Sequence, residues 1–248
     1  MKRLVDLPYG EKLTQRLDLY LPDGQTEAVL VYFHGGGLDS GDKEGSLLPG
    51  TYLAERGIAM ISANYRMYPE ANYPDFIEDA ASAVAWAREY MRTHLKCERL
   101  YVGGTSAGAY LSMMLCFDPR YLSMVGIAPN DISGYFHDAG QPTKHFRVLR
   151  ACGENPRRVI VDETAPMYHV GTSPSYPPMR FIISDDDVKG RYEQTMLMLV
   201  TLSNLGYSGF DHVVMHGTHC AYWNRTDENG DSLLGGMMLD FIRHTENV

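Results

Sequence analysis

Ser106 stands in a segment where a serine could act as a nucleophile. It is the centre of GTSAG (104–108), which has Gly-x-Ser-x-Gly spacing and follows the apolar run 100–102. A strand before such a segment and a helix after it would place the serine on a sharp turn with its hydroxyl exposed. Taken alone, the segment is equally consistent with a serine that only caps a helix.

A nucleophilic serine needs a base and an acid, and the sequence offers candidates for both after Ser106. A serine hydroxyl is a weak nucleophile near neutral pH, so a base must take its proton and an acid must orient that base. His219 follows the strand-like run 211–216, and the three aspartates 185–187 follow the run 179–184. Each aspartate by itself would be an ordinary solvated loop residue. Their joint position at consecutive strand ends favours a catalytic set, with the identity of the acid open among Asp185, Asp186 and Asp187.

The segment HGGG (34–37) could supply the hydrogen-bond donors that acyl transfer requires. It follows the run AVLVYF (28–33). Attack on an ester carbonyl places negative charge on its oxygen, and glycines without Cβ atoms let backbone N–H groups approach that oxygen. We expect the N–H groups of Gly35, Gly36 and Ala107 to form this oxyanion hole, and His34 to brace the loop. The alternative is a flexible Gly-rich turn.

Strand-like and helix-like segments alternate along most of the chain. Helices would connect the strands, and parallel neighbours need such crossovers, so the pattern predicts an α/β fold with a mostly parallel central sheet and helices on both faces. The expected strands lie at 28–33, 58–65, 99–104, 124–129, 179–184 and 211–216, and the expected helices at 74–93, 111–117, 192–205 and 233–243.

Two regions depart from this alternation. The segment QRLDLYLP (15–22) alternates like a half-exposed strand and reaches 28–33 through the turn PDGQ, which predicts an antiparallel hairpin at the start of the sheet. Residues 130–172 are rich in polar, Gly and Pro residues and are too many for a plain connection. We expect them to form a small cap within a single domain spanning 1–248.

Composition narrows the classes of partner. The formal net charge of −9 disfavours nucleic acid and anionic membranes as partners. The N-terminus lacks the apolar stretch of a signal peptide, and no run is long and apolar enough to span a bilayer, so a cytoplasmic protein is expected. We expect neither a metal nor an organic cofactor.

The chain resembles the α/β-hydrolases of the HGGG esterase branch, being similar to hormone-sensitive-lipase-like carboxylesterases and to bacterial acetyl-xylan and feruloyl esterases. The resemblance is carried by YGEKLTQRLDLYLP, HGGGLDSGDK, SANYRMYPEANYPDFIEDAASAVAWARE, ETAPMYHVGTSPSYPPMRFIISDDDV and MHGTHCAYW. It implies the α/β-hydrolase fold, with Ser106 as nucleophile. The family's acid precedes a Glu-Gln pair by several residues, which favours Asp187 before 193–194, and a glycine two residues earlier favours His219 over His216 as the base.

The resemblance also implies an activity. It predicts a serine carboxylesterase that hydrolyses small to medium acyl esters through an acyl-enzyme, including acetylated or feruloylated carbohydrates, as a monomer or homodimer. An amide-cleaving serine hydrolase is the first alternative, and a non-catalytic binding protein on the same fold is the second. We expect Tyr65, Tyr135 and Trp223 to contact substrate, because aromatic walls suit acyl, aryl or sugar groups.

Overall fold

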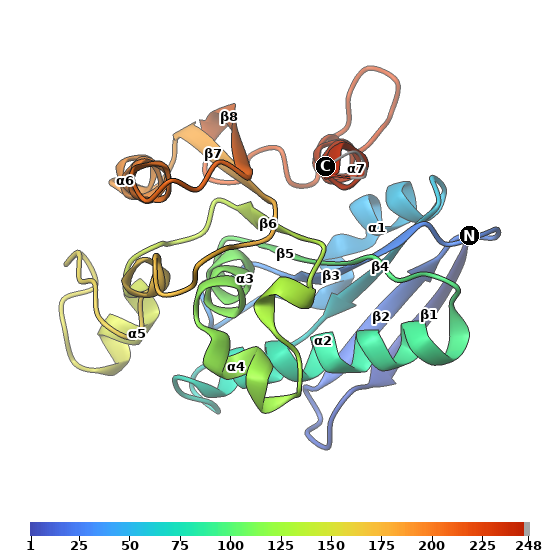
Figure 1. Cartoon of the computed structure of the whole chain (residues 1–248), viewed down its shortest axis with the longest axis horizontal. Coiled ribbons are helices and arrows are strands. Elements are labelled where there is room, and N and C mark those ends of the chain that lie inside the picture. Colours follow the sequence, from blue (N-terminus) through green and yellow to red (C-terminus); the bar gives the residue numbers. More distant parts are fainter. Residues whose placement is uncertain (246–248) are drawn as a thin grey trace.

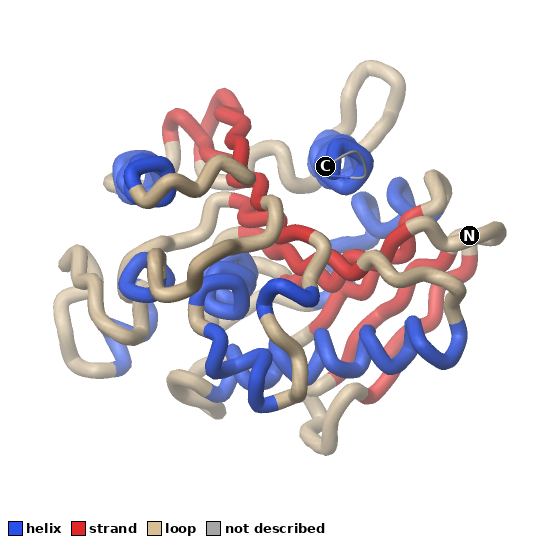
Figure 2. The backbone as a smooth tube through the Cα atoms, viewed as in Figure 1, coloured by secondary structure: helices blue, strands red, loops and turns tan. Residues whose placement is uncertain are grey.

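The protein is built around one twisted sheet. The computed structural model describes residues 1–245, in which eight strands form this sheet (Figures 1 and 2). The strands are β1 (Lys2–Pro8), β2 (Arg16–Leu21), β3 (Ala28–Phe33), β4 (Ile58–Ala63), β5 (Leu100–Thr105), β6 (Gly134–Asp138), β7 (Met179–Asp186) and β8 (Phe210–Thr218). Their order across the sheet is β1-β2-β4-β3-β5-β6-β7-β8.

The sheet is mostly parallel, as the sequence predicts. Strands β4, β3, β5, β6, β7 and β8 pair in parallel, while β2 runs antiparallel to both of its neighbours, β1 and β4. The expected N-terminal hairpin is therefore present, but its partners differ from those expected. The hairpin joins β1 to β2. Strand β3 does not pair with β2 but lies on the far side of β4, with which it pairs in parallel. The turn PDGQ reverses the direction of the chain, but it does not determine which strands pair.

Helices cover both faces of the sheet (Figure 1). One face carries α2, α3, α4 and α6, and the other carries α1 and α7, each face with its own buried apolar cluster. The bounds are α1 (Leu47–Ala54), α2 (Asp75–His94), α3 (Ala107–Phe117), α4 (Pro119–Met124), α5 (Phe146–Ala151), α6 (Arg191–Asn204) and α7 (Leu233–His244).

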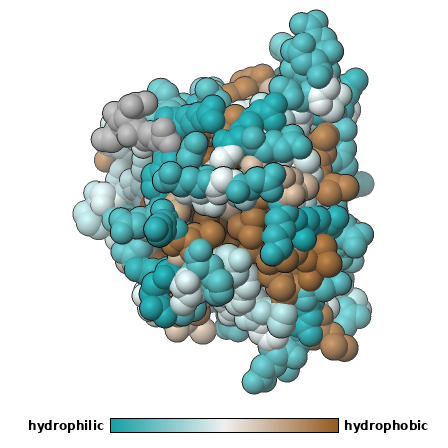
Figure 3. All heavy atoms as spheres, turned by 90° about the vertical axis from the view of Figure 1, so that its right-hand side faces the viewer, coloured by the Kyte–Doolittle hydropathy of each residue, from teal (hydrophilic) through white to brown (hydrophobic). Residues whose placement is uncertain are grey.

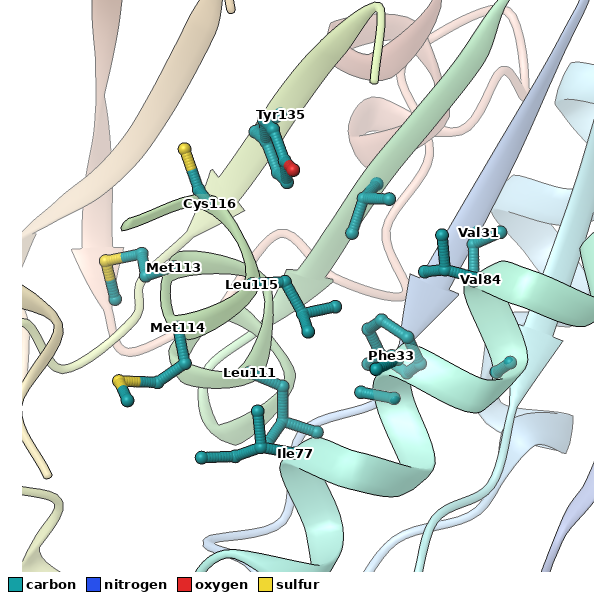
Figure 4. Close-up of a cluster of buried hydrophobic side chains, with 14 of the residues drawn as sticks. Val31, Phe33, Ile77, Val84, Leu111, Met113, Met114, Leu115, Cys116 and Tyr135 are labelled. Atoms are coloured by element: carbon teal, nitrogen blue, oxygen red, sulfur yellow. The ribbon is translucent and has the colours of Figure 1, made fainter. Parts of the chain in front are cut away.

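The larger apolar cluster anchors the helix that begins at Ser106. In Figure 4, Leu111 and Leu115 of α3 point toward Phe33 of β3 and toward Ile77 and Val84 of α2. Every residue of α3 is buried. Full burial of an amphipathic or apolar helix against the sheet stabilises it far more than helix propensity does, so packing holds the N-terminus of α3 in place.

The expected strand at 124–129 is wrong. Residues 119–124 form α4, and the next strand of the sheet is β6, within the segment expected to form the cap. The run MVGIAP is apolar enough for a strand, but its first residue, Met124, is the last residue of α4. Asp118 caps the start of this helix, and its side chain accepts a hydrogen bond from the Arg120 N–H. Strand β1 and helix α1 were not anticipated from the sequence.

After β6, residues 139–172 form a loop-rich segment beside the HGGG loop. It contains α5 and the 3₁₀ turn Pro166–His169. Arg147 of α5 forms an ion pair of 3.1 Å with Asp39, and a Cβ atom on Gly37 would lie 3.0 Å from the Phe146 ring. The segment thus packs directly on the loop that follows β3.

The molecular surface mixes polar and apolar residues. Figure 3 shows the face on the side of the N-terminus, where apolar residues gather in the middle and hydrophilic residues surround them. Among residues 1–245, no helix has the length and hydropathy needed to cross a membrane.

Candidate active site

Ser106 occupies a strained turn between β5 and α3. Its backbone has φ 55° and ψ −110°, a conformation that residues with a Cβ atom rarely adopt. The Ser106 N–H donates to the carbonyl of Asp138 on the neighbouring strand at 2.7 Å. Although Ser106 stands at the N-cap position of α3, its hydroxyl makes no capping hydrogen bond within the described chain. The helix-cap alternative therefore does not account for this serine.

Glycines on either side of Ser106 make the turn sterically feasible. A Cβ atom on Gly104 would lie 2.3 Å from the backbone carbon of Gly108, and a Cβ atom on Gly108 would lie 1.9 Å from the carbonyl oxygen of Phe33. Both distances are far below van der Waals contact with atoms of the backbone. Glycine at these two positions lets α3 begin against β3 and β5, which fixes where the serine side chain points.

The hydroxyl of Ser106, the ring of His219 and the carboxylate of Asp187 form one hydrogen-bonded chain. His219 Nε2 lies 2.8 Å from Ser106 Oγ, and His219 Nδ1 lies 2.6 Å from Asp187 Oδ1. A carboxylate accepts from Nδ1–H, which leaves Nε2 unprotonated in the neutral ring and ready to accept the serine proton. The Asp187 side chain is 1% exposed and that of His219 is 26% exposed.

The three consecutive aspartates have separate roles in the structure. Asp187 turns inward to His219, whereas Asp185 pairs with the exposed His216 at 2.5 Å and accepts from the Gly217 N–H at 2.8 Å. Asp186 ends β7 and is exposed. In a regular strand, Asp185 and Asp187 would point to the same side, because they are two residues apart. The irregularity between Ser184 and Asp186 breaks this alternation, so the two side chains reach different partners.

The HGGG loop is held in shape by buried contacts of His34. The His34 ring stacks on Tyr65 at 4.6 Å, its Nδ1 donates to the Gly35 carbonyl at 2.6 Å, and the Tyr65 hydroxyl donates to the His34 carbonyl at 2.8 Å. Burial lowers the pKa of His34, so the ring is neutral near pH 7. His34 thus contacts the loop itself, in the bracing position expected from the sequence.

The glycines after His34 lie against the serine turn. A Cβ atom on Gly35 would lie 3.3 Å from the Ser106 Cβ. Gly36 has φ 114°, and a Cβ atom there would lie 2.0 Å from the Ser40 carbonyl oxygen, so only glycine fits. Ala107 is the first residue of α3, where backbone N–H groups have no partner within the helix. Gly35 and Gly36 thus line the same cavity as Ser106, and Ala107 follows Ser106 in the chain.

A cavity of about 380 Å³ opens beside Ser106. Its walls include Gly35, Gly36, Ser106, His219, Cys220 and Trp223. Asp42 also lines it, with its carboxylate held by Asn64 Nδ2 at 2.8 Å. The volume lies at the lower end of the range that ligand pockets occupy, about 300–1,000 Å³. Asp42 and Cys220 were not expected in the walls.

Of the three aromatic residues expected to contact substrate, Trp223 lines this cavity and the two tyrosines do not. Tyr65 is fully buried behind His34, where its hydroxyl supports the HGGG loop. Tyr135 lies in the apolar core near Cys116 (Figure 4), and its hydroxyl donates to the Pro129 carbonyl at 3.2 Å. The sequence predicts a cap over residues 130–172. Tyr135 instead lies inside the central strand β6, where side chains pack under helices.

Asp138 lies next to the serine turn and was not among the candidate residues identified from the sequence. It ends β6 and is fully buried, and its carboxylate accepts hydrogen bonds from Thr105 and Tyr222. The signal was available, because YFHD is an aromatic run that ends in an aspartate at the same edge of the sheet as Ser106. This run lies within residues 130–172, which are expected from the sequence to form a cap without regular strands. Among residues 1–245, no three His, Cys, Asp or Glu residues gather as they would around a metal ion.

Comparisons with known proteins agree with this architecture. The BD-FAE family model matches residues 17–124. A probable isoprenylcysteine alpha-carbonyl methylesterase of Oryza sativa is 36% identical over 107 residues, which are 42% of this chain and 25% of that protein. Kynurenine formamidase of Danio rerio is 31% identical over 115 residues, 45% of this chain and 38% of that protein. The chain thus matches well under half the length of these relatives.

A solved structure matches nearly the whole chain. Esterase B from Lactobacillus Rhamnosis superposes with a TM-score of 0.80 at 15% sequence identity, covering 99% of this chain and 86% of that one. At this identity the likeness establishes the fold. The mostly parallel sheet and this likeness show that the chain has the α/β-hydrolase fold, and residues 17–124 resemble the BD-FAE family.

Proposed function

We propose that the protein is a serine hydrolase that cleaves small carboxylic esters through an acyl-enzyme. The observation that carries this proposal is the continuous chain from Ser106 Oγ to His219 Nε2 and from His219 Nδ1 to Asp187, with contacts of 2.8 and 2.6 Å. Nucleophile, base and orienting acid in this relation are what acyl transfer requires. The esterase names of the relatives and of the structural neighbour support the same activity.

The first half of the reaction forms the acyl-enzyme. His219 Nε2 takes the Ser106 proton while Oγ attacks the ester carbonyl, and Asp187 stabilises the imidazolium that results. The carbonyl oxygen gains negative charge and receives hydrogen bonds from backbone N–H groups of Gly35, Gly36 and Ala107. The tetrahedral intermediate then collapses: the bond from carbon to the leaving oxygen breaks, and that oxygen takes the proton from His219.

The second half returns the enzyme to its starting state. A water molecule enters the site of the departed alcohol and gives a proton to His219 as it attacks the acyl carbon. The same backbone donors stabilise the second oxyanion. Collapse breaks the bond between the acyl carbon and Ser106 Oγ, and His219 returns its proton to the serine, so the carboxylic acid leaves with no net change in the enzyme.

The cavity favours compact substrates with a polar part. About 380 Å³ suits a short acyl chain or a single ring rather than a long lipid tail. Trp223 offers an aromatic face, and the carboxylate of Asp42 can accept hydrogen bonds from hydroxyl groups. Acetylated or feruloylated carbohydrates fall within this proposal, with the sugar against Trp223.

Amide cleavage is a second candidate that one comparison favours. A relative over 115 residues is named kynurenine formamidase, and the same nucleophile, base and oxyanion donors serve both ester and amide bonds. An amide differs in its poorer leaving group, so His219 must protonate the departing nitrogen before the bond breaks. Comparing matched esters and amides on the purified protein distinguishes the two candidates.

The decisive experiment measures hydrolysis of p-nitrophenyl acetate, butyrate and octanoate and of p-nitroacetanilide. We expect turnover of the short esters to exceed that of octanoate and of the anilide. Ser106→Ala and His219→Ala should each lower kcat by roughly 10⁴- to 10⁶-fold. The matched controls are Ser123→Ala and His216→Ala, two exposed residues outside the hydrogen-bonded chain. An active Ser106→Ala variant overturns the proposal, and faster turnover of the anilide than of the esters selects the amidase.

A further inference from the structure

A second buried carboxylate lies beneath the serine turn, and the hydrolytic steps above do not use it. Asp138 closes β6 in parallel register with Thr105, the residue before Ser106. It is fully buried, and in the described chain its carboxylate accepts from two hydroxyl groups and not from Lys or Arg. A buried carboxylate without a cation is costly unless its oxygens are hydrogen-bonded, so its retention calls for an explanation in terms of its partners.

Both oxygens of Asp138 accept from hydroxyl groups next to the proposed catalytic residues. Thr105 Oγ1 donates to Oδ2 at 2.5 Å, and the Tyr222 hydroxyl donates to Oδ1. Thr105 precedes Ser106, and Tyr222 follows His219 by three residues. The carbonyl of Asp138 also accepts from the Ser106 N–H at 2.7 Å. One residue thereby ties the serine turn at the end of β5 to the histidine loop after β8.

These hydrogen bonds suit the ionised form of Asp138, which accepts at both of its oxygens. The hydroxyl of Tyr32 is hydrogen-bonded to Thr105 Oγ1, so Tyr32 can donate to Thr105 while Thr105 donates to Asp138. A protonated carboxyl would donate through one oxygen, so the hydrogen bond at that oxygen would have to reverse its direction. Charge and geometry at this position are therefore coupled.

The negative charge of Asp138 acts on His219. Attraction to His219 favours the ionised form of Asp138, and repulsion from Asp187 disfavours it. The imidazolium that forms when His219 takes the Ser106 proton is attracted to ionised Asp138 by the same interaction. The titratable and hydroxyl groups that face Asp138 come from β3, β5 and the loops after β7 and β8: Tyr32, Thr105, Asp187, His219, Cys220 and Tyr222.

We propose that Asp138 is a positioning residue for the serine and histidine of this site. Its carboxylate holds the serine turn and the histidine loop at their working separation, and its charge stabilises the His219 imidazolium that forms when Ser106 loses its proton. This inference rests on the proposed hydrolytic function. Burial raises the pKa of Asp138 to about 6, so the residue carries its charge at neutral pH and loses it under mildly acidic conditions.

The test compares pH profiles of kcat/KM for p-nitrophenyl acetate in the wild type, Asp138→Asn and Tyr222→Phe. Asp138→Asn removes the charge and keeps the size of the side chain. We expect kcat to fall roughly 10- to 100-fold, and the acid limb of the profile to move to lower pH, because the wild-type limb includes the titration of Asp138 near pH 6 and the variant lacks that group. Tyr222→Phe removes a hydrogen bond that lowers the pKa of Asp138 and keeps the charge, so kcat should fall and the acid limb should not move to lower pH.

The two variants separate a positioning role from a structural one. A variant that only loosened the fold would lose activity without moving the acid limb. Circular dichroism checks folding, and if Asp138→Asn does not fold, the drop in kcat of Tyr222→Phe at unchanged KM decides the question. Asp23→Asn, which alters a carboxylate that is 82% exposed, controls for net charge. Wild-type kcat in Tyr222→Phe, or an unmoved acid limb in folded Asp138→Asn, overturns the inference. A wild type without Ser106-dependent esterase activity overturns the proposed function instead.

Discussion

The imidazole of His219 and the carboxylate of Asp187 are joined by an Nδ1···Oδ1 contact of 2.6 Å, and the Asp187 side chain is almost completely buried. Three residues earlier, His216 makes a similar contact of 2.5 Å with Asp185, yet the His216 side chain is 95% exposed. Two histidine–aspartate pairs thus extend from the ends of β7 and β8. Of these two histidines, only His219 also lies within hydrogen-bonding distance of a serine.

The buried pair, and not the exposed one, should govern activity. Asp187→Asn removes the charge that holds His219 in the tautomer with a free Nε2, so we predict a fall in kcat of roughly 10⁴-fold. Asp185→Asn alters a pair whose histidine faces solvent, and we predict a change within about twofold. Steady-state kinetics with p-nitrophenyl acetate at pH 8 measures both variants. The reverse ranking would assign the acid to Asp185 and would require the histidine loop to rearrange.

The glycine at 108 should be indispensable for folding as well as for the serine turn. A Cβ atom on Gly108 would lie 1.9 Å from the Phe33 carbonyl oxygen, and neither backbone can move without displacing α3 from the sheet. We predict that Gly108→Ala lowers the free energy of unfolding by about 3 kcal/mol or more. Urea unfolding followed by circular dichroism measures the change.

Gly24 provides the matched control for that prediction. A Cβ atom on Gly24 would meet nothing within 4 Å, so Gly24→Ala should change the free energy of unfolding by less than about 1 kcal/mol. Equal effects at the two glycines would mean that the helix can shift to admit a methyl group. In that case the close approach of α3 to β3 would not be what fixes the serine turn.

Local patterns in the sequence predicted β3 and α2. The run 28–33 forms β3 with the same bounds, and the helix expected at 74–93 is α2 (Asp75–His94). Strand β3 is a continuous apolar run that is completely buried, and the apolar residues of α2 recur at helical spacing along its buried face. Pairing of strands was less accessible, because β2 meets β4 through contacts distant in sequence, and local turn chemistry does not encode them.

The candidate site divides in the same way. Ser106 and His219 could be located from strand ends and motif spacing, since the chemistry itself restricts which residue types can fill these positions. Strand ends left the acid open among residues 185–187, and the family resemblance favoured Asp187. The residues around the site could not be located in this way. Tyr65 and Tyr135 have the side chains of a substrate wall but are used for packing, and Asp138 has the side chain of a surface loop but is buried. Burial is a property of the folded chain, and the identity of one residue does not determine it.

Asp138 also makes a prediction about stability that is independent of substrate. Burial raises its pKa from the ordinary value of 3.8 to about 6, so between these values the folded protein keeps a proton that the unfolded chain has released. Stability must then fall as pH rises through this window, because the folded state binds more protons than the unfolded state. A shift of about two units corresponds to about 3 kcal/mol, and above pH 6 to 7 the contribution no longer changes.

Asp138→Asn removes this titration, so the difference in unfolding free energy between the variant and the wild type should change with pH. Between pH 4 and pH 7 we predict a change in favour of the variant of up to about 3 kcal/mol. Urea unfolding of both proteins at half-unit intervals of pH measures it, with the other carboxylates common to both. A difference that stays constant over the range would mean that Asp138 remains ionised throughout, with Thr105 and Tyr222 compensating fully for its burial. A positive result would show that the protein keeps a destabilising charge beneath Ser106, as a positioning role for Asp138 requires.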